Sequence, residues 1–313
     1  MKILITGGAG FIGSHVQDEL IRLGHTVAVL DNLRSGSREN LNEKTAFFYE
    51  ADITDRDKVS QIMNDFKPEI VFHFAAQNNV PDSMKDPYLD LDYNIAGTFN
   101  VAYCAHLSGA RRIIYSNTGG ALYGEQSDEN LPIKEDQIID RPTSFYGVSK
   151  GVAEEYFRLF QHVYGLEWVS LRFANVYGPR QVGKGEAGII AIFTQKMVDG
   201  EQAVIFGDGL HTRDYVYISD IVKACIMAMS LKESDYLHIS SGIEVSNIQI
   251  YQIMAKYLGI SDEPTYAPDR PGDVRRSVLD QSKMLRLLDW KPTVTIEEGI
   301  HRTIDYYRRN KNK

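Results

Sequence analysis

Two residues near the middle of the chain could carry proton chemistry. Tyr146 and Lys150 stand four positions apart at the start of a segment with a helical pattern. At that spacing two side chains lie on the same helix face, one turn apart. A neighbouring cation favours the ionised form of a phenol, so Lys150 is expected to lower the pKa of Tyr146, which is about 10 for an unperturbed tyrosine. Such a tyrosine can act as a general base near neutral pH, although an isolated Tyr-x-x-x-Lys pair is also typical of ordinary helix packing.

A glycine-rich turn opens the chain. The segment Thr6-Gly7-Gly8-Ala9-Gly10-Phe11-Ile12-Gly13 directly follows the first expected strand and begins the first expected helix. Glycines at this spacing let the backbone turn tightly, approach a pyrophosphate and pack the helix against the strand. The N–H groups of the helix N-terminus can then bind phosphates. The pattern predicts a dinucleotide site with contacts from Gly7, Gly10, Phe11, Ile12 and Gly13.

Strand ends further along the chain extend this prediction. Asp31 ends the second expected strand, about twenty residues past the glycines, where an acid can bind the ribose hydroxyls of an adenosine. Because an acid repels a 2′-phosphate, NAD is favoured over NADP, although the neighbouring Arg34 leaves NADP open. Further cofactor contacts are expected at the ends of the second, third and fourth strands, from Asn32, Asp52, Ile53, Phe74, Ala75, Ala76 and Gln77.

The composition bounds the class of protein. The 313 residues are 43% hydrophobic and 24% charged, as in a globular protein with a sizeable core. A formal net charge of -8 argues against nucleic acid or an anionic membrane surface as the main partner. The two cysteines, Cys104 and Cys225, lack metal-ligand spacing and fit buried positions in a reducing compartment. We expect no metal site, no membrane span and a cytoplasmic location.

The order of the elements predicts an α/β fold with a doubly wound parallel sheet of the Rossmann type. Short β-rich runs alternate with longer helical patterns up to residue 172, which is typical of parallel strands joined by helices. Ligands of such a sheet bind at the carboxyl ends of its strands. The expected strands are 2–6, 26–30, 46–50, 70–74, 112–116 and 168–172. The expected helices lie near 12–23, 55–65, 87–108 and 145–164.

A second, smaller lobe is expected after residue 172, where loops rich in glycine and proline separate short strands. The first domain is therefore placed at 1–172, with 213–235 returning to it. The lobe would comprise 173–212 and 236–313. Its expected elements are a strand at 203–206, helices near 187–199, 220–231 and 246–258, and a final helix at 296–309.

A dinucleotide loop combined with a Tyr-x-x-x-Lys helix resembles the extended short-chain dehydrogenase/reductase family, and within it the UDP-glucose (UDP-galactose) 4-epimerases. The resemblance runs through essentially the whole chain. The motifs that carry it lie at 6–15, 31–33, 73–77, 94–98, 116–124, 146–150, 175–181, 207–209, 213–215 and 270–273. By this resemblance the C-terminal lobe binds a nucleotide sugar, and the cofactor is NAD.

The resemblance also implies catalytic roles. Thr118 takes the place of the family's catalytic Ser/Thr and would bond the sugar 4-oxygen beside Tyr146, with Ser116 as a competitor. Lys150 would bind the nicotinamide ribose. Asn94 would lie near the catalytic helix, and Tyr177 would lie against the nicotinamide end of the cofactor.

For the substrate, the resemblance implies that Arg213 and Arg270 clamp the diphosphate, a task that suits the planar fork of arginine. On the residues alone, both arginines could instead form surface ion pairs with Asp214 and Asp273. The other implied substrate contacts are Asn175, Val204, Phe206, Asp273 and Ser277. The chain departs from the family at Ala187-Gly188-Ile189, where many members have Asn-Asn-Leu.

The residues after Thr118 select among the family's reactions. Related dehydratases and decarboxylases place acidic residues there, but this chain has Gly119-Gly120, which cannot transfer a proton. Inversion of C4 of a UDP-sugar needs no second acid, so an epimerase is predicted. Because Ser277 is small, UDP-N-acetylglucosamine is a candidate beside UDP-glucose, and UDP-glucuronate or a pentose analogue stays open. A non-catalytic NAD sensor is disfavoured because Tyr146 and Lys150 are both present. A homodimer through 87–108 and 145–164 is expected from the resemblance.

Overall fold

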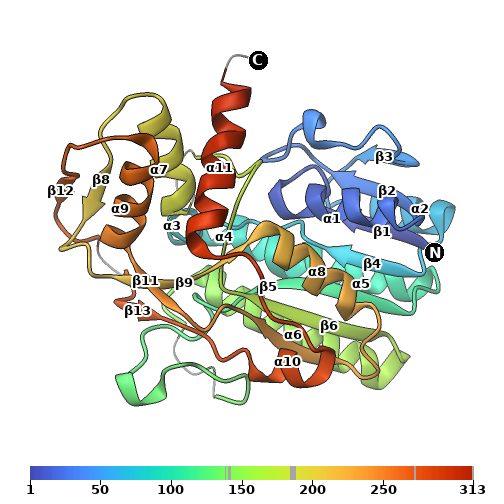
Figure 1. The fold of residues 1–313 in the computed structure, drawn as a ribbon. Coiled ribbons are helices and arrows are strands. Elements are labelled where there is room, and N and C mark those ends of the chain that lie inside the picture. The colour runs from blue at the N-terminus through green and yellow to red at the C-terminus, as the bar shows by residue number, and fades with distance from the viewer. Residues whose placement is uncertain (138, 140–141, 184–187, 271–272, 312–313) are drawn as a thin grey trace. The chain divides into compact units, whose positions relative to one another are not determined.

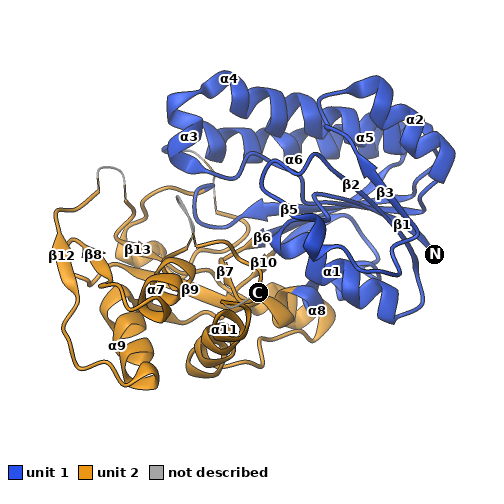
Figure 2. Cartoon of the chain, turned by 90° about the horizontal axis from the view of Figure 1, so that it is seen from above, with its two compact units in different colours: residues 1–122, 142–172, 222–237 blue, residues 123–141, 173–221, 238–313 orange. Residues whose placement is uncertain are grey.

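The computed structural model describes residues 1–137, 139, 142–183, 188–270 and 273–311. The chain divides into two compact units (Figure 2). Unit 1 comprises residues 1–122, 142–172 and 222–237, and unit 2 comprises residues 123–141, 173–221 and 238–313.

A seven-stranded sheet is the frame of unit 1, in the order β10-β6-β5-β4-β1-β2-β3 (Figure 1). Its pairings from β5 through β4, β1 and β2 to β3 are parallel, which confirms the predicted doubly wound sheet. The chain builds outward from β1 through β2 to β3 and then returns to β4, so the order reverses beside β1. Ligands of doubly wound sheets bind at such a switch point. The strands are β1 (Lys2–Thr6), β2 (Thr26–Asp31), β3 (Phe47–Glu50), β4 (Ile70–His73), β5 (Arg112–Thr118), β6 (Glu167–Phe173) and β10 (Asp235–Ile239).

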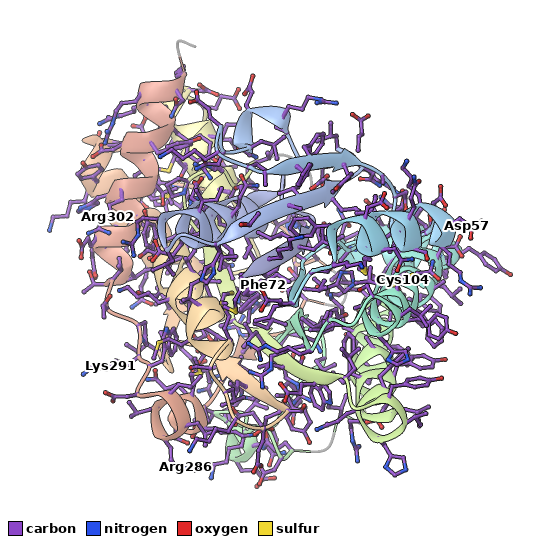
Figure 3. All side chains as sticks on the ribbon, turned by 90° about the vertical axis from the view of Figure 1, so that its right-hand side faces the viewer. Asp57, Phe72, Cys104, Arg286, Lys291 and Arg302 are labelled. Atoms are coloured by element: carbon purple, nitrogen blue, oxygen red, sulfur yellow. The ribbon has the colours of Figure 1, made fainter. Side chains whose placement is uncertain are left out.

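Helices cover both faces of this sheet, which explains why its central strands β1 and β4 are buried at nearly every position (Figure 2). On one face, Leu4 and Ile113 of the sheet pack in one core with Met63 of α2 and Phe157 of α6. Phe72 of β4 and Cys104 of α5 are both buried in unit 1 (Figure 3). Cys225 is buried as well, so both cysteines are the core thiols that the sequence predicted. The helices are α1 (Phe11–Arg22), η1 (Arg38–Asn40), α2 (Arg56–Phe66), α3 (Val80–Lys85), α4 (Pro87–Asp90), α5 (Thr98–Leu107), α6 (Phe145–Tyr164) and α8 (Ile218–Ala228).

The helix predicted at 87–108 is interrupted. Between α4 and α5 the residues Leu91–Gly97 form a π-helical stretch, η2. A π-helix hydrogen-bonds from i to i+5, is rare, and is frequently found at functional sites. Asn94 lies inside η2 and is buried.

Unit 2 has two small sheets. In one, β9 pairs with β11, β13 and β7, and in the other β12 pairs with β8. Strand β13 ends at Ser277, and Leu279 makes a single bridge with Ile133. The elements are η3 (Asp128–Asn130), β7 (Asn175–Tyr177), α7 (Ile189–Val198), β8 (Val204–Phe206), β9 (Thr212–Tyr217), β11 (Glu244–Ser246), α9 (Asn247–Leu258), β12 (Thr265–Ala267), β13 (Arg276–Ser277), α10 (Ser282–Leu288) and α11 (Ile296–Asn310).

Candidate active site

Two hydrogen bonds fix the start of helix α6, which carries Tyr146. The Ser144 hydroxyl caps the helix by accepting from the Gly147 N–H at 3.1 Å. The Tyr146 N–H donates to the Ser83 hydroxyl of α3 at 3.2 Å. Both bonds satisfy N–H groups that a helix N-terminus leaves without an internal partner. These two hydrogen bonds therefore fix the backbone of Tyr146 in the first turn of α6.

Lys150 lies one turn further along α6 and is buried. Its Nζ donates to the Ser116 carbonyl at 2.8 Å and lies 6.0 Å from the centre of the Tyr146 ring. It also lies 4.3 Å from the centre of the Tyr115 ring, a cation–π distance. Burial lowers the pKa of Lys150 to about 7, while the charges of Asp90 and Glu154 oppose this fall. The predicted pairing of Tyr146 and Lys150 on one helix face is present.

The electrostatics of Tyr146 differ from the sequence expectation. Burial raises the pKa of Tyr146 above its ordinary value, and the charge of Asp90 adds to the rise. A hydrogen bond with Thr118 works in the opposite direction. The expectation that Lys150 by itself brings the phenolate within reach is therefore wrong for the protein alone, because burial disfavours the charged phenolate.

The two candidate hydroxyls on β5 have different partners. Thr118 interacts with Tyr146 through its side chain, and its Oγ1 accepts from the backbone N–H groups of Gly120 and Ala121 at 3.3 and 3.2 Å. The Ser116 hydroxyl instead donates to the His73 carbonyl at 3.3 Å. The geometry therefore favours Thr118 over Ser116 as the neighbour of Tyr146.

Sequence reasoning missed a buried carboxylate beside this site. Asp90, at the end of α4, accepts from the Ser149 hydroxyl at 2.5 Å and from the Asn94 amide at 2.7 Å. Asn94 in turn exchanges hydrogen bonds with the backbone of Gln77, at 3.0 and 2.8 Å. The predicted cofactor residues Asn94 and Gln77 are thus brought together. The available signal was an acid one helical turn before Asn94, a spacing that places two side chains on one face.

The glycine loop has the geometry that a dinucleotide requires. A Cβ at Gly13 would lie 2.3 Å from the Gly7 carbonyl oxygen, and one at Gly7 would lie 2.6 Å from the Ala75 nitrogen. The loop after β4 (74–77) therefore packs on the glycine turn without side chains between them. Gly10 offers no side-chain cap at the start of α1, which leaves that helix end for a phosphate to bind. Phe11 and Ile12 lie partly exposed in its first turn. These features fit a bound NAD pyrophosphate.

The predicted adenosine end contains a second group of polar side chains. Asp31 accepts from the backbone N–H groups of Ala9 and Leu33 at 2.9 and 2.8 Å. Burial raises the pKa of the Asp31 carboxyl, while these two bonds oppose the rise.

Beside Asp31, the Asn32 amide donates to Asp52 at 2.7 Å. Tyr93, which sequence reasoning did not select, donates to the same carboxylate at 2.7 Å. The Arg34 guanidinium lies 5.3 Å from the centre of the Tyr93 ring. Ile53, the next predicted contact, is buried, and Ala76 is partly exposed.

Unit 2 brings together several of the predicted substrate residues. The Arg270 guanidinium lies 3.9 Å from the centre of the Phe206 ring. Arg213 and Ser277 are direct neighbours in the paired strands β9 and β13. Asp214 is buried and accepts from Ser241 and from the Gly242 backbone. Within the described part of the chain, Arg213 donates to the Thr212 carbonyl at 2.8 Å rather than to Asp214, so the alternative ion pair does not form.

The remaining predicted substrate residues lie in different surroundings. Asn175 donates to the Asp214 carbonyl at 3.2 Å. Val204 is partly exposed in β8. Asp273 is exposed, and its backbone N–H donates a hydrogen bond to the Arg270 carbonyl at 3.3 Å. The departure at Ala187 and residues 271–272 of the 270–273 motif lie outside the described residues.

Tyr177 does not have the exposed ring that its predicted role requires. Its ring is only 2% exposed and packs edge to face on Tyr217, with centres 5.5 Å apart. Its hydroxyl donates to the Ile296 carbonyl at 3.5 Å, and a Cβ at Gly299 would lie 2.1 Å from that hydroxyl oxygen. This burial argues against the predicted position of Tyr177 against the nicotinamide end of the cofactor.

A doubly wound sheet, a glycine turn at its switch point and a Thr–Tyr–Lys group define a dinucleotide-dependent enzyme of the short-chain dehydrogenase/reductase type. A sequence model of the NAD dependent epimerase/dehydratase family matches residues 3–239. The chain belongs to this family, and its cofactor is NAD.

Solved structures of similar proteins agree with this assignment. The UDP-glucose 4-epimerase of Thermotoga maritima, solved with UDP-glucose, has a TM-score of 0.96 and 44% identity, over 99% of each chain. The UDP-glucose 4-epimerase of Thermus thermophilus, solved with NAD, has a TM-score of 0.91 and 38% identity, over 98% of this chain and 99% of that one. The UDP-N-acetylglucosamine 4-epimerase of Methanobrevibacter ruminantium, in complex with UDP-N-acetylmuramic acid, has a TM-score of 0.92 and 32% identity, over 99% of this chain and 98% of that one.

Two further observations concern metal ions and membranes. Among the described residues, no group of three or more His, Cys, Asp or Glu side chains is arranged to hold a metal ion. In the same part of the chain, every helix falls short of the length and apolar character that a membrane span needs.

Proposed function

We propose that this enzyme inverts C4 of a UDP-hexose, interconverting UDP-glucose and UDP-galactose through a transient 4-keto sugar. The observation that carries the proposal is the group formed by Tyr146, Thr118 and Lys150, in which we assign proton transfer to Tyr146. Gly119 and Gly120 follow Thr118, and the N–H groups of Gly120 and Ala121 bond back to the threonine hydroxyl. They supply no second acid of the kind that elimination of water would need.

The side chains divide the chemistry between them. Tyr146 removes the proton from the sugar 4-hydroxyl and returns it after the sugar has turned over. Thr118 bonds the 4-oxygen, and its bond to Tyr146 favours the phenolate. Lys150 binds the nicotinamide ribose and supplies positive charge near the phenol. When bound, NAD supplies the hydride acceptor and donor.

We place the cofactor on unit 1 and the UDP moiety on unit 2. Arg213 and Arg270 bind the diphosphate, which suits planar donors of two parallel hydrogen bonds. Phe206, against which Arg270 stacks, borders the base together with Val204, and Asp273 accepts from the uridine ribose. Asn175 contacts the substrate near β9.

A second candidate substrate is UDP-N-acetylglucosamine. Ser277 is a small residue beside Arg213, and a small side chain at this position leaves room for an N-acetyl group at sugar C2. The similarity to an enzyme that acts on UDP-N-acetylglucosamine supports this alternative. Incubation with UDP-galacturonate tests whether the enzyme also accepts UDP-uronates as substrates.

The test is to incubate the purified protein separately with UDP-galactose, UDP-N-acetylgalactosamine and UDP-galacturonate, without added NAD, and to separate the products by chromatography. We expect conversion of UDP-galactose. Tyr146→Phe should lower the rate by a factor on the order of 10² to 10⁴, the usual contribution of general acid–base catalysis. Tyr257→Phe, an exposed tyrosine on α9, is the matched control and should leave the rate unchanged. If none of the three sugars reacts, the epimerase proposal is wrong.

We also propose a cytoplasmic homodimer that forms through helices α5 and α6. Exposed apolar side chains follow one stripe of α6, at Tyr156, Leu159 and Val163, which are 37%, 55% and 55% exposed. Phe99 of α5 contacts Tyr156 edge to face, with ring centres 5.3 Å apart. A contiguous exposed apolar surface of this kind marks an interaction site, and a second copy of the same helix pair would cover it symmetrically. The free cysteines agree with a reducing compartment.

A further inference from the structure

A carboxylate without a part in the proposed reaction lies behind the catalytic helix. Asp90 is fully buried, and both of its oxygens accept hydrogen bonds. Oδ2 accepts from the Ser149 hydroxyl at 2.5 Å, and Oδ1 accepts from the Asn94 amide at 2.7 Å. An ionised carboxylate has acceptors only, so two donors at its two oxygens fit that form. Within the described part of the chain, both donors are neutral groups.

The partners of Asp90 connect it to the reacting groups. Ser149 stands between Tyr146 and Lys150 on α6, directly before the lysine. Asn94 is held on its other side by two hydrogen bonds with the Gln77 backbone, at 3.0 and 2.8 Å. Asp90 therefore joins the loop after β4 to the catalytic helix through a chain of short hydrogen bonds.

The charge of Asp90 acts on both members of the catalytic pair. It raises the pKa of Tyr146 in addition to the rise caused by burial. It also opposes the fall that burial imposes on the pKa of Lys150. Both effects have the sign expected of a nearby negative charge, which disfavours phenolate and favours ammonium.

The other titratable groups that face the pair do not replace this charge. Glu154 of α6 is paired with the Arg172 guanidinium at 2.6 Å, which compensates its charge. His73 of β4 is held neutral, because burial lowers its pKa to about 3. Burial raises the pKa of Tyr115 of β5, so it carries no charge near neutral pH. Among the described groups that face the pair, Asp90 is left as the negative charge without a cationic hydrogen-bond partner.

We propose that Asp90 is a positioning residue whose charge sets the pH range in which Tyr146 and Lys150 act. This inference rests on the proposed function, because it assumes that the two residues transfer and support a proton. The acid limb of the activity profile then reports loss of the Tyr146 proton, and the alkaline limb reports loss of the Lys150 charge. Without the charge of Asp90 both events occur at lower pH.

The first experiment is the pH profile of kcat with UDP-galactose for the wild-type protein and Asp90→Asn, which keeps the shape of the side chain and removes its charge. We expect both limbs to move to lower pH by on the order of one pH unit. A nearby charge shifts a pKa by about this much when solvent partly screens the interaction. Ser149→Ala is the matched control, because it removes a hydrogen bond and keeps the carboxylate. It should lower the plateau and leave both limbs where they are.

The second experiment does not depend on turnover. The ultraviolet absorbance of tyrosinate is titrated in the NAD-loaded protein, and the Tyr146 contribution is taken as the difference from the matching Tyr146→Phe protein. In the Asp90→Asn background the midpoint of this contribution should fall by the same order of one unit. A wild-type protein that lacks epimerase activity would contradict the proposed function alone, because the absorbance titration still tests Asp90.

Two results would overturn the inference. One is an Asp90→Asn profile with unchanged limbs and only a lower plateau, which would make Asp90 a structural residue. The other is an equal shift of the limbs in Ser149→Ala, which would assign the effect to the hydrogen bond rather than to the charge. If Asp90→Asn does not accumulate as folded protein, the Asp90→Ala/Ser149→Ala double variant removes the carboxylate together with one of its two donors, and its limbs are compared with those of Ser149→Ala alone.

Discussion

At the scale of single residues, the shifts of Tyr146 and Lys150 have one physical cause. Burial disfavours charge, so the pKa of the phenol rises and the pKa of the ammonium falls to about 7. The protein alone therefore keeps Tyr146 protonated at neutral pH. The positive nicotinamide ring of oxidised NAD would shift this balance toward phenolate. Under the proposed function, the base becomes available when the oxidised cofactor is in place.

His73 gives the first prediction, for stability against acid. The side chain is fully buried and bonds Thr6 and Thr98 through its two ring nitrogens, at 2.6 and 3.0 Å. Burial, aided by the charge of Lys150, lowers its pKa from 6.5 to about 3. Between these values the unfolded chain binds a proton that the native protein does not. The free energy of unfolding should therefore fall as the pH falls from 6.5 toward 3, by up to a few kcal/mol from this group.

The measurement is urea unfolding of the wild-type protein and His73→Gln across this pH range. Glutamine can still bond a threonine hydroxyl but does not titrate, so the decline in the free energy of unfolding should be shallower in His73→Gln. His162→Gln, at an exposed position on α6, is the control and should follow the wild-type slope. Equal slopes in all three proteins would show that His73 is not the group that resists protonation.

At the scale of the elements, the position of helix α6 depends on one glycine. A Cβ at Gly147 would lie 2.3 Å from the Ala121 carbonyl oxygen and 3.1 Å from the Pro142 Cβ. The missing side chain lets the loop that follows Thr118 pack directly on the first turn of the helix. The distance between the Thr118 and Tyr146 hydroxyls is therefore controlled by a residue that takes no part in the chemistry.

Gly147→Ala should consequently destabilise the protein by about 1–3 kcal/mol, the usual cost of overpacking, and should lower kcat more than it changes KM. Gly151→Ala in the same helix is the matched control. Its Cβ would lie 3.3 Å from the Leu122 Cδ1, a side-chain atom that can move, and alanine gains helix propensity of about 1 kcal/mol over glycine. Thermal unfolding and steady-state kinetics of the two variants test the idea, which fails if both behave alike.

Much of this arrangement could be predicted from the sequence, for reasons that differ between elements. The apolar strands and the glycine turn have local signatures, so β1, α1 and the doubly wound sheet follow directly from periodicity and spacing. The π-helical stretch at Leu91–Gly97 could not be predicted, because the apolar pattern of a helix continues through it. Asp90 was missed because acids are mostly exposed, and its burial depends on Ser149 from a distant helix.

The fate of Tyr177 shows a complementary limit. Its neighbours in the sequence belong to a recognisable motif, but the direction of its side chain is decided by β9 and α11. Gly299 makes the space that the ring occupies. A pattern of neighbouring residues predicts where a segment lies, whereas tertiary packing decides which way a side chain points.

At the scale of the whole molecule, the exposed stripe on α6 predicts the assembly state. The stripe repeats at positions 156, 159 and 163, the spacing of one helix face. Next to it, Phe99 contacts Phe160 with ring centres 5.3 Å apart, and His106 stacks on Tyr164 at 4.3 Å. The aromatic and apolar surface is therefore continuous from α5 to α6. Two copies related by a two-fold axis could bury this surface as a four-helix interface.

Leu159→Glu should separate these copies, because it places a charge without a partner at the centre of the stripe. The dimer dissociation constant should rise on the order of a hundredfold, which corresponds to the loss of about 2–3 kcal/mol at a central interface position. Sedimentation equilibrium over a range of protein concentrations measures it. Leu285→Glu on α10 is the control, since Leu285 is a similarly exposed leucine at 44% and lies outside the stripe. A wild-type protein that is monomeric at all concentrations, or a Leu159→Glu variant that dimerises as the wild type does, would exclude this surface as the dimer interface.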